Sequence, residues 1–239
     1  MAKVSMKLLT DLIHDEYKKS NIQVSVKKNP VYHVSPLINL TSEQQKILSD
    51  GDGQTEDQYK QINSSTGLAV NYYKILEELA SITDLIFENK IAKPLNKGGR
   101  FANLDVSYKK NGVLHYVESK FLEPYYSGNE TIKDSYLDIS KYPVEVEENK
   151  EEWRNLFNKA SEFEYYNFSQ LCRHLLALYR YTHGIKGSEY KGEQVVLQSV
   201  TWEMTPQFMK KLDQKNSIDM QKRIEQLQAE ANKCQEIFN

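Results

Sequence analysis

The dipeptide Asn111-Gly112 is the feature of the sequence that most restricts the fold. Asn-Gly is the preferred pair for a two-residue type I′ turn between antiparallel strands. The flanking segments alternate apolar and polar residues, so the sequence predicts a β-hairpin from Phe101 to Phe121. With this turn, Lys110 faces Val113, and the register of every other cross-strand pair is fixed.

Four polar residues are predicted to share one face of this hairpin. The register places Asp105 opposite Glu118 and Asn103 opposite Lys120, and residues two apart on a strand lie on the same face. Opposed side chains have Cβ atoms roughly 4.5–5.5 Å apart, so the two carboxylates would repel each other. A divalent cation removes the conflict, because Mg²⁺ commonly binds one or two carboxylates. The alternative is an ordinary solvated face of alternating acids and lysines.

The other face of the hairpin is predicted to be apolar. It is formed by alternate residues of the two strands: Leu104, Val106, Val117 and Phe121. Apolar neighbours on both sides of the charged positions favour central strands over edge strands.

The rest of the chain predicts helices around the hairpin. Apolar residues recur at helical spacing in four segments: the N-terminus, Ser65 to Asn89, Glu152 to Tyr181 with a break near Asn167, and the tail from Pro206. The segment Glu193 to Met204 predicts a further strand, and the acidic segment Tyr125 to Glu152 predicts an extended loop. This pattern predicts an α/β or α+β fold with a central mixed sheet flanked by helices.

Composition narrows the class of protein. The 239 residues contain no apolar run of about 18 residues, so no membrane span is predicted. Two cysteines, Cys172 and Cys234, form no disulfide framework, and we expect a cytoplasmic protein with reduced thiols. The net charge of −2 predicts no overall basic surface, but the segment Ile86 to Lys120 has seven Lys or Arg and three Asp or Glu. Its alternative interpretation is a solvated face.

Asp105, followed after twelve residues by Glu118-Ser119-Lys120, resembles the PD-(D/E)xK nuclease superfamily. The text around both motifs is similar to a bacterial group of restriction-endonuclease-like proteins. Two further patterns are similar to the helices of that group: Ser64-Ser65 followed by Asn71, and Gln170 with His174. Leu104 stands where the superfamily often has proline before the aspartate.

The resemblance implies Mg²⁺-dependent hydrolysis of DNA phosphodiester bonds, with Mn²⁺ as a substitute. It implies that Asp105 and Glu118 are metal ligands, that the Ser119 carbonyl is another, and that Lys120 positions or activates water. Glu78 is the candidate for the acidic residue that the superfamily often carries on a preceding helix. The short motif also occurs in inactive relatives, so the alternative is a catalytically inactive nuclease-fold protein that binds nucleic acid.

Four side chains are further candidates for contacts with metal-bound water or phosphate: Asn71, Asn103, Gln170 and His174. Their structural alternative is a capping or solvated polar role. The resemblance divides the chain into an N-terminal helical extension (1–62), a nuclease-like core (63–204) and a C-terminal helical tail (205–239), together forming one compact domain. A homodimer is also considered, because cutting both DNA strands often requires two sites.

Overall fold

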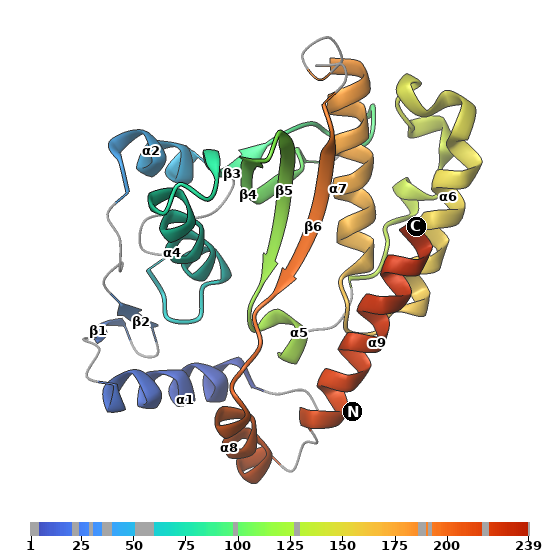
Figure 1. Ribbon diagram of the computed structural model, residues 1–239. Helices are drawn as coiled ribbons and strands as arrows, with labels where there is room; N and C mark the ends of the chain where they lie inside the picture. The colour runs from blue at the N-terminus through green and yellow to red at the C-terminus, as the bar shows by residue number, and fades with distance from the viewer. Residues whose placement is uncertain are drawn as a thin grey trace.

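The computed structural model describes residues 5–20, 24–28, 31–34, 40–50, 60–97, 100–126, 130–185, 190, 193–216 and 220–238. Its centre is a four-stranded sheet in the order β3-β4-β5-β6 (Figure 1). The strands are β3 (Thr83–Lys90), β4 (Asn103–Lys110), β5 (Val113–Lys120) and β6 (Val195–Thr201). The first three are antiparallel neighbours and β6 runs parallel to β5, so the predicted mixed sheet is confirmed.

The hairpin has the predicted turn and register. Asn111 and Gly112 have φ angles of 53° and 80°, as a type I′ turn requires. The paired residues run from Lys110 with Val113 to Val106 with Val117. The predicted apolar face is wrong as a single face, because Leu104 and Val106 belong to different core clusters. The regular alternation is interrupted at the residue between them, Asp105.

Helices cover both faces of the sheet, with α4 on one side and α7 on the other (Figure 1). On the α4 side, Ala69, Val70 and Tyr73 pack with Val106 and Val117. On the α7 side, Ala177 and Leu178 pack with Leu104 and Tyr116. The helices are α1 (Met6–Lys19), α2 (Ser42–Asp50), α4 (Ser65–Glu78), α5 (Glu123–Tyr126), α6 (Lys150–Asn158), α7 (Phe168–Arg180), α8 (Pro206–Asn216) and α9 (Met220–Phe238). A separate antiparallel pair joins β1 (Val24–Lys28) and β2 (Val31–Val34).

The helix predicted from Ser65 to Asn89 is wrong in its last third. The helix α4 ends at Glu78, where Ala80 takes a left-handed φ of 53° and the Ser81 N–H bonds the Leu76 carbonyl. This is the Schellman arrangement that ends many helices. The chain then enters β3, whose sequence TDLIFENK contains the β-branched and aromatic residues that strands favour.

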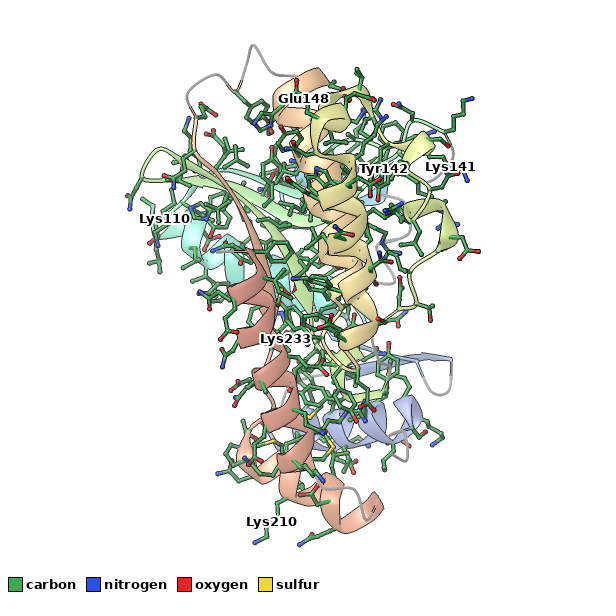
Figure 2. All side chains as sticks on the ribbon, turned by 90° about the vertical axis from the view of Figure 1, so that its right-hand side faces the viewer. Lys110, Lys141, Tyr142, Glu148, Lys210 and Lys233 are labelled. Carbon is green, nitrogen blue, oxygen red and sulfur yellow. The ribbon has the colours of Figure 1, made fainter. Side chains whose placement is uncertain are left out.

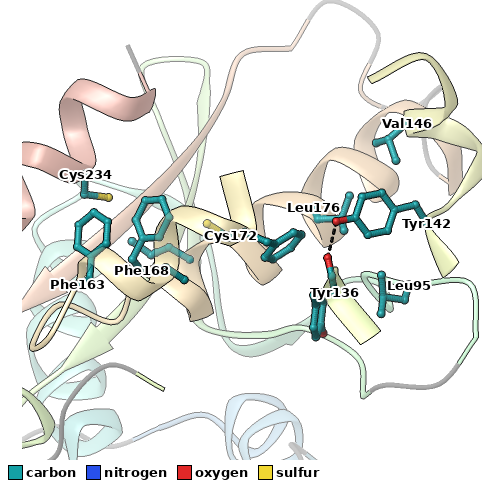
Figure 3. Close-up of a cluster of buried hydrophobic side chains, with 12 residues drawn as sticks. Leu95, Tyr136, Tyr142, Val146, Phe163, Phe168, Cys172, Leu176 and Cys234 are labelled. Atoms are coloured by element: carbon teal, nitrogen blue, oxygen red, sulfur yellow. Dashed lines mark hydrogen bonds between the residues drawn. The ribbon is translucent and has the colours of Figure 1, made fainter. Parts of the chain in front are cut away.

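The segment predicted as an extended loop, Tyr125 to Glu152, contains short helical turns and contributes to the core. Its 3₁₀ turns are η1 (Asp134–Tyr136), η2 (Ile139–Lys141) and η3 (Val144–Asn149). Figure 3 shows Tyr136, Tyr142 and Val146 in the same apolar cluster as Phe168 of α7. The Tyr142 hydroxyl donates a hydrogen bond to the Tyr136 carbonyl. The predicted break near Asn167 is confirmed, because its side chain caps the start of α7.

The two ends of the described chain pack together. Leu9 and Leu12 of α1 share a core cluster with Leu212 of α8 and Met220 of α9. In Figure 2, α8, marked by Lys210, lies at one end of the molecule, and α9, marked by Lys233, runs from there along its body. None of the described helices combines the length and the apolarity that crossing a membrane requires.

Candidate active site

A cavity of about 980 Å³ lies where β4 begins and β5 ends, away from the hairpin turn. The strands contribute Glu88, Asn103, Asp105, Glu118, Ser119 and Lys120 to its wall. The start of α4 contributes Ser65 and Thr66, and α7 contributes Gln170, Arg173 and His174. The sheet and two helices on opposite faces therefore bring their polar residues to one place.

Three carboxylates form a row across adjacent strands at this cavity. In β3 and β4, Phe87 pairs with Val106 and Asn89 pairs with Leu104, so Glu88 lies across from Asp105. The observed pairing of β4 with β5 ends at Val106 with Val117, and Asp105 and Glu118 are the next residues of the two strands. Glu88 has a left-handed φ of 50°, a conformation that costs energy for a residue other than glycine and is often found at functional sites.

Asp105 is fixed by its own hairpin. Its Oδ2 atom accepts a hydrogen bond of 2.6 Å from the Ser119 backbone N–H, and the ladder of paired residues ends just before it. Burial raises the pKa of Asp105 well above its usual value, and the charges of Glu118 and Glu88 raise it further. Its surroundings therefore disfavour the charged form of this carboxyl group, and a bound cation would counter that effect.

Glu118 is surrounded by groups that stabilise its negative charge. Its Oε1 atom lies 2.6 Å from Lys120 Nζ and accepts a 2.6 Å hydrogen bond from Gln170 Nε2. Its Oε2 atom lies 3.1 Å from His174 Nε2. Burial alone would raise the pKa of Glu118, but the charge of Lys120, with His174, outweighs burial and lowers the pKa to about 2. Glu118 is thus ionised at neutral pH.

Lys120 remains a cation in this setting. Burial would lower the pKa of its ammonium group, but the charges of Glu118 and Asp105 outweigh burial and raise that pKa above its ordinary value. A fixed positive charge beside two carboxylates suits binding of a phosphate oxygen better than proton abstraction.

Glu88 is, like Glu123, a further carboxylate of the cavity wall that the sequence analysis did not identify. It accepts hydrogen bonds from Asn103 Nδ2 and, at 3.4 Å, from Thr66 Oγ1. Burial, assisted by the charge of Glu118, raises the pKa of Glu88 to about 7. In the structure, buried Leu85 and Phe87 alternate with exposed Ile86. In the sequence these three residues form a continuous apolar run, which fits the predicted helix as well as a strand.

Seven of the nine candidate residues from the sequence line the cavity: Asn103, Asp105, Glu118, Ser119, Lys120, Gln170 and His174. Glu78 and Asn71 do not line it. Both lie on α4, which reaches the cavity with its first residues. A helix rises about 1.5 Å per residue, so exposed Glu78, at the opposite end of α4, is carried away from the site. The cavity wall instead contains Glu88 of β3.

The donor atoms of the cavity fit a small divalent cation in their chemistry. Hard oxygen ligands are what Mg²⁺ binds. The cavity wall holds four carboxylates, those of Glu88, Asp105, Glu118 and Glu123, and a buried Asn103 Oδ1 atom without a hydrogen-bond partner among the described residues. Within the described part of the chain, no three His, Cys, Asp or Glu side chains are already arranged as a metal-binding group. Because Glu118 points both oxygens at Lys120, Gln170 and His174, its carboxylate would have to turn to bind an ion.

Comparison with known proteins gives one match. No curated protein and no solved structure was found to be similar to the chain. The model of the family described as "Restriction Endonuclease associating with ARP" matches residues 9–203, which include the whole central sheet and all the cavity residues named above. The chain therefore belongs to this restriction-endonuclease-like family.

Proposed function

We propose that the protein is a Mg²⁺-dependent DNA endonuclease of the PD-(D/E)xK type. The observation that carries this proposal is the convergence of Asp105, Glu118 and Lys120 in one large cavity. The two acids come directly after the last paired residues of the hairpin, and Lys120 contacts Glu118 at 2.6 Å. Membership in a restriction-endonuclease-like family supports the same class of reaction.

In this proposal Asp105, Glu118 and the Ser119 carbonyl hold the ion. When bound, Mg²⁺ lowers the pKa of a bound water and stabilises charge on the scissile phosphate. Lys120 positions the phosphate and the attacking water by its charge. Gln170 and His174 orient Glu118 through the contacts described above, and the Ser119 N–H orients Asp105.

The proposed substrate is DNA, and cations of the cavity wall, which equal its acids in number, are the candidates for contacts with phosphates. Arg100, Lys133 and Arg173 line the wall together with the acids. Cations at such positions attract phosphates and would make binding weaken as salt increases. Homodimer formation and a cytoplasmic location stay predictions.

The test is cleavage of plasmid and linear DNA with Mg²⁺, and with Mn²⁺ as a substitute. We expect Asp105→Ala and Lys120→Ala each to lower the cleavage rate roughly 10²–10³-fold or more, because each removes charge that the transition state needs. Lys109→Ala is the matched control, since Lys109 lies on the same strand as Asp105 and pairs with Glu193 outside the cavity.

Circular dichroism and thermal unfolding would check that each variant is folded. Parent-like cleavage by both folded variants would overturn the assignment of the site.

A second candidate function is a DNA-binding protein without turnover. The engagement of both Glu118 oxygens by neighbouring side chains favours it, because this arrangement is stable without an ion. Calorimetric titration with Mg²⁺ or Mn²⁺ separates the two candidates. Metal binding without cleavage of any DNA form would support the binding protein, and cleavage that depends on Asp105 would exclude it.

A further inference from the structure

Phe101 is an aromatic side chain that lines the cavity and is 50% exposed. Single exposed apolar residues are common on protein surfaces, so exposure alone has no significance. Its surroundings are more specific. The Nζ atom of Lys93 lies 5.4 Å from the centre of the phenyl ring. Arg100, the residue before Phe101, is also part of the cavity wall.

The backbone directly after Phe101 is held by two hydrogen bonds. The Ala102 N–H donates to the Ala92 carbonyl at 2.7 Å, and the Ile91 N–H donates to the Ala102 carbonyl at 3.0 Å. These bonds extend the pairing of β3 and β4 to the residue next to the phenyl ring. The ring is therefore attached to the sheet that carries the three carboxylates.

The segment that carries Lys93 is also anchored. Arg180 of α7 donates from Nη1 to the carbonyl of Lys93 at 3.0 Å and to that of Leu95 at 3.3 Å. Asn96 donates two hydrogen bonds: its backbone N–H donates to the Lys141 carbonyl, and its side-chain Nδ2 donates to the Tyr142 carbonyl. An exposed ring and a nearby cation are thus presented on a fixed frame, which lowers the entropy lost when a ligand binds.

We propose that Phe101 is a stacking platform for an unpaired DNA base, and that the substrate strand is single or locally unpaired beside the bond that is cut. This inference rests on the proposed function and specifies its substrate class. A base within duplex DNA already has both faces covered by its neighbours, so the ring can stack only on a base that has left the stack. Aromatic rings among cations are the usual means of binding single strands without sequence preference.

The shape and charge of the cavity agree with an extruded nucleotide. Its volume of about 980 Å³ lies at the upper end of the roughly 300–1,000 Å³ typical of small-molecule sites. The cavity can therefore receive a base in addition to the phosphate. Lys93 beside the ring and Arg100 in the cavity wall would neutralise the phosphates that flank this base.

The experiment measures binding of a labelled single strand and of a hairpin duplex of the same sequence by fluorescence anisotropy. Ca²⁺ replaces Mg²⁺, so that a hard divalent cation is present, and gels verify that the DNA stays intact. Phe101→Ala should weaken single-strand binding roughly 5- to 150-fold, the loss of one base–aromatic stack, and should change duplex binding by a smaller factor.

Two further substitutions isolate the aromatic face. Phe101→Tyr keeps the ring and should bind the single strand like the parent. Phe101→Leu keeps apolar volume without a ring and should resemble Phe101→Ala. Phe238→Ala removes another exposed aromatic side chain, 40% exposed and outside the cavity wall, and should leave binding unchanged.

A base analogue gives a direct readout, because the fluorescence of 2-aminopurine is quenched when it stacks. The parent and Phe101→Tyr should quench a 2-aminopurine at one position of the strand, and Phe101→Ala should not.

Equal weakening of single-strand and duplex binding, or no weakening of either, would overturn the inference. Because no cleavage is measured, the result stands apart from the test of Asp105 and Lys120. DNA cleavage that depends on Asp105, together with unchanged binding in Phe101→Ala, would retain the nuclease and reject the platform.

Discussion

Asp105 and Glu118 show how two identical functional groups in one cavity acquire opposite properties. Glu118 has a lysine, a glutamine and a histidine within contact distance, and its pKa falls to about 2. Asp105 has one backbone donor and two acidic neighbours, and its pKa rises. The difference follows from the side chains around each carboxyl, since both are buried and both lie on the same hairpin. One acid is thus kept ionised, and the other is left for a proton or a cation to neutralise.

Glu88 provides a test of these electrostatics that does not depend on catalysis. Its pKa is about 7 in the folded chain and near its ordinary value of 4.5 in the unfolded chain. Between these two pH values, Glu88 keeps its proton in the folded state and loses it in the unfolded state. The free energy of unfolding therefore falls as pH rises from about 4.5 to about 7. We expect Glu88→Gln to remove this loss and to raise the free energy of unfolding at about pH 8 by at most roughly 3 kcal/mol.

Chemical denaturation of parent and variant across this pH range would measure the effect. The two should differ little near pH 4.5 and increasingly above it. Glu78→Gln is the matched control, because Glu78 is an exposed glutamate outside the cavity. A difference between Glu88→Gln and parent that stays constant with pH would contradict the assignment of the raised pKa to Glu88.

At the scale of single elements, the hairpin could be predicted from sequence and β3 could not. The local turn Asn111-Gly112 sets the register of β4 and β5 as far as Val106 and Val117, but the interruption at Asp105 could not be predicted from it. In the segment after Glu78, Ile82 and Ile86 fit the spacing of a helix, but Ile86 lies in β3 and pairs with Ser107 of β4. The choice is made by contacts with a distant strand, and for that reason the helix was extended too far and Glu88 was missed.

The contacts that hold α7 against the site are also non-local. Glu230 of α9 accepts hydrogen bonds from three consecutive backbone N–H groups, those of Glu164, Tyr165 and Tyr166, at 2.9, 2.9 and 2.7 Å. The next residue, Asn167, caps α7 and also bonds the Gln170 side chain. The helix α9 thus fixes the entry to the helix that carries Gln170 and His174, and no sequence pattern near either element indicates it.

Glu230→Gln tests this role of α9. Glutamine keeps one acceptor oxygen and loses the charge, so we expect the free energy of unfolding to fall by about 1–3 kcal/mol. We also expect the side-chain amide resonance of Gln170 to shift, because the entry to α7 is no longer held by three bonds. Thermal unfolding and nitrogen-15 NMR spectra would measure the two effects. Glu236→Gln, an exposed change on the same helix, should alter neither, and an unchanged Gln170 resonance in Glu230→Gln would exclude the positioning role.

At the scale of the whole molecule, the terminal segments are built into the core. One cluster contains Leu9 and Leu12 of α1, Leu122 next to the active-site hairpin, and Leu212 of α8. Cys234 of α9 packs in the cluster of α6 and α7. The apolar periodicity of the sequence predicts these terminal helices. It does not predict their partners, because an amphipathic pattern indicates only that one face of the helix must be buried. The boundaries at residues 62 and 204 stay predictions, since contacts across them do not measure whether the parts unfold together.

Leu212→Ala tests whether the chain unfolds as one unit. Leu212 is 0% exposed within the cluster that joins both ends of the chain to the hairpin, and replacing such a leucine by alanine typically costs 2–5 kcal/mol. If the cluster and the sheet form one cooperative unit, calorimetry should show a single transition whose Tm falls by roughly 4–20 °C, at 2–4 °C per kcal/mol for a chain of this size. Lys210→Ala, an exposed change on the same helix, should leave the Tm unchanged.

Two transitions, of which only one moves in Leu212→Ala, would show that α1, α8 and α9 form a unit separate from the sheet. A single shifted transition would mean that the terminal helices stabilise the site directly. The connection is Leu122, which lies two residues after Lys120 and packs in the same cluster as Leu212.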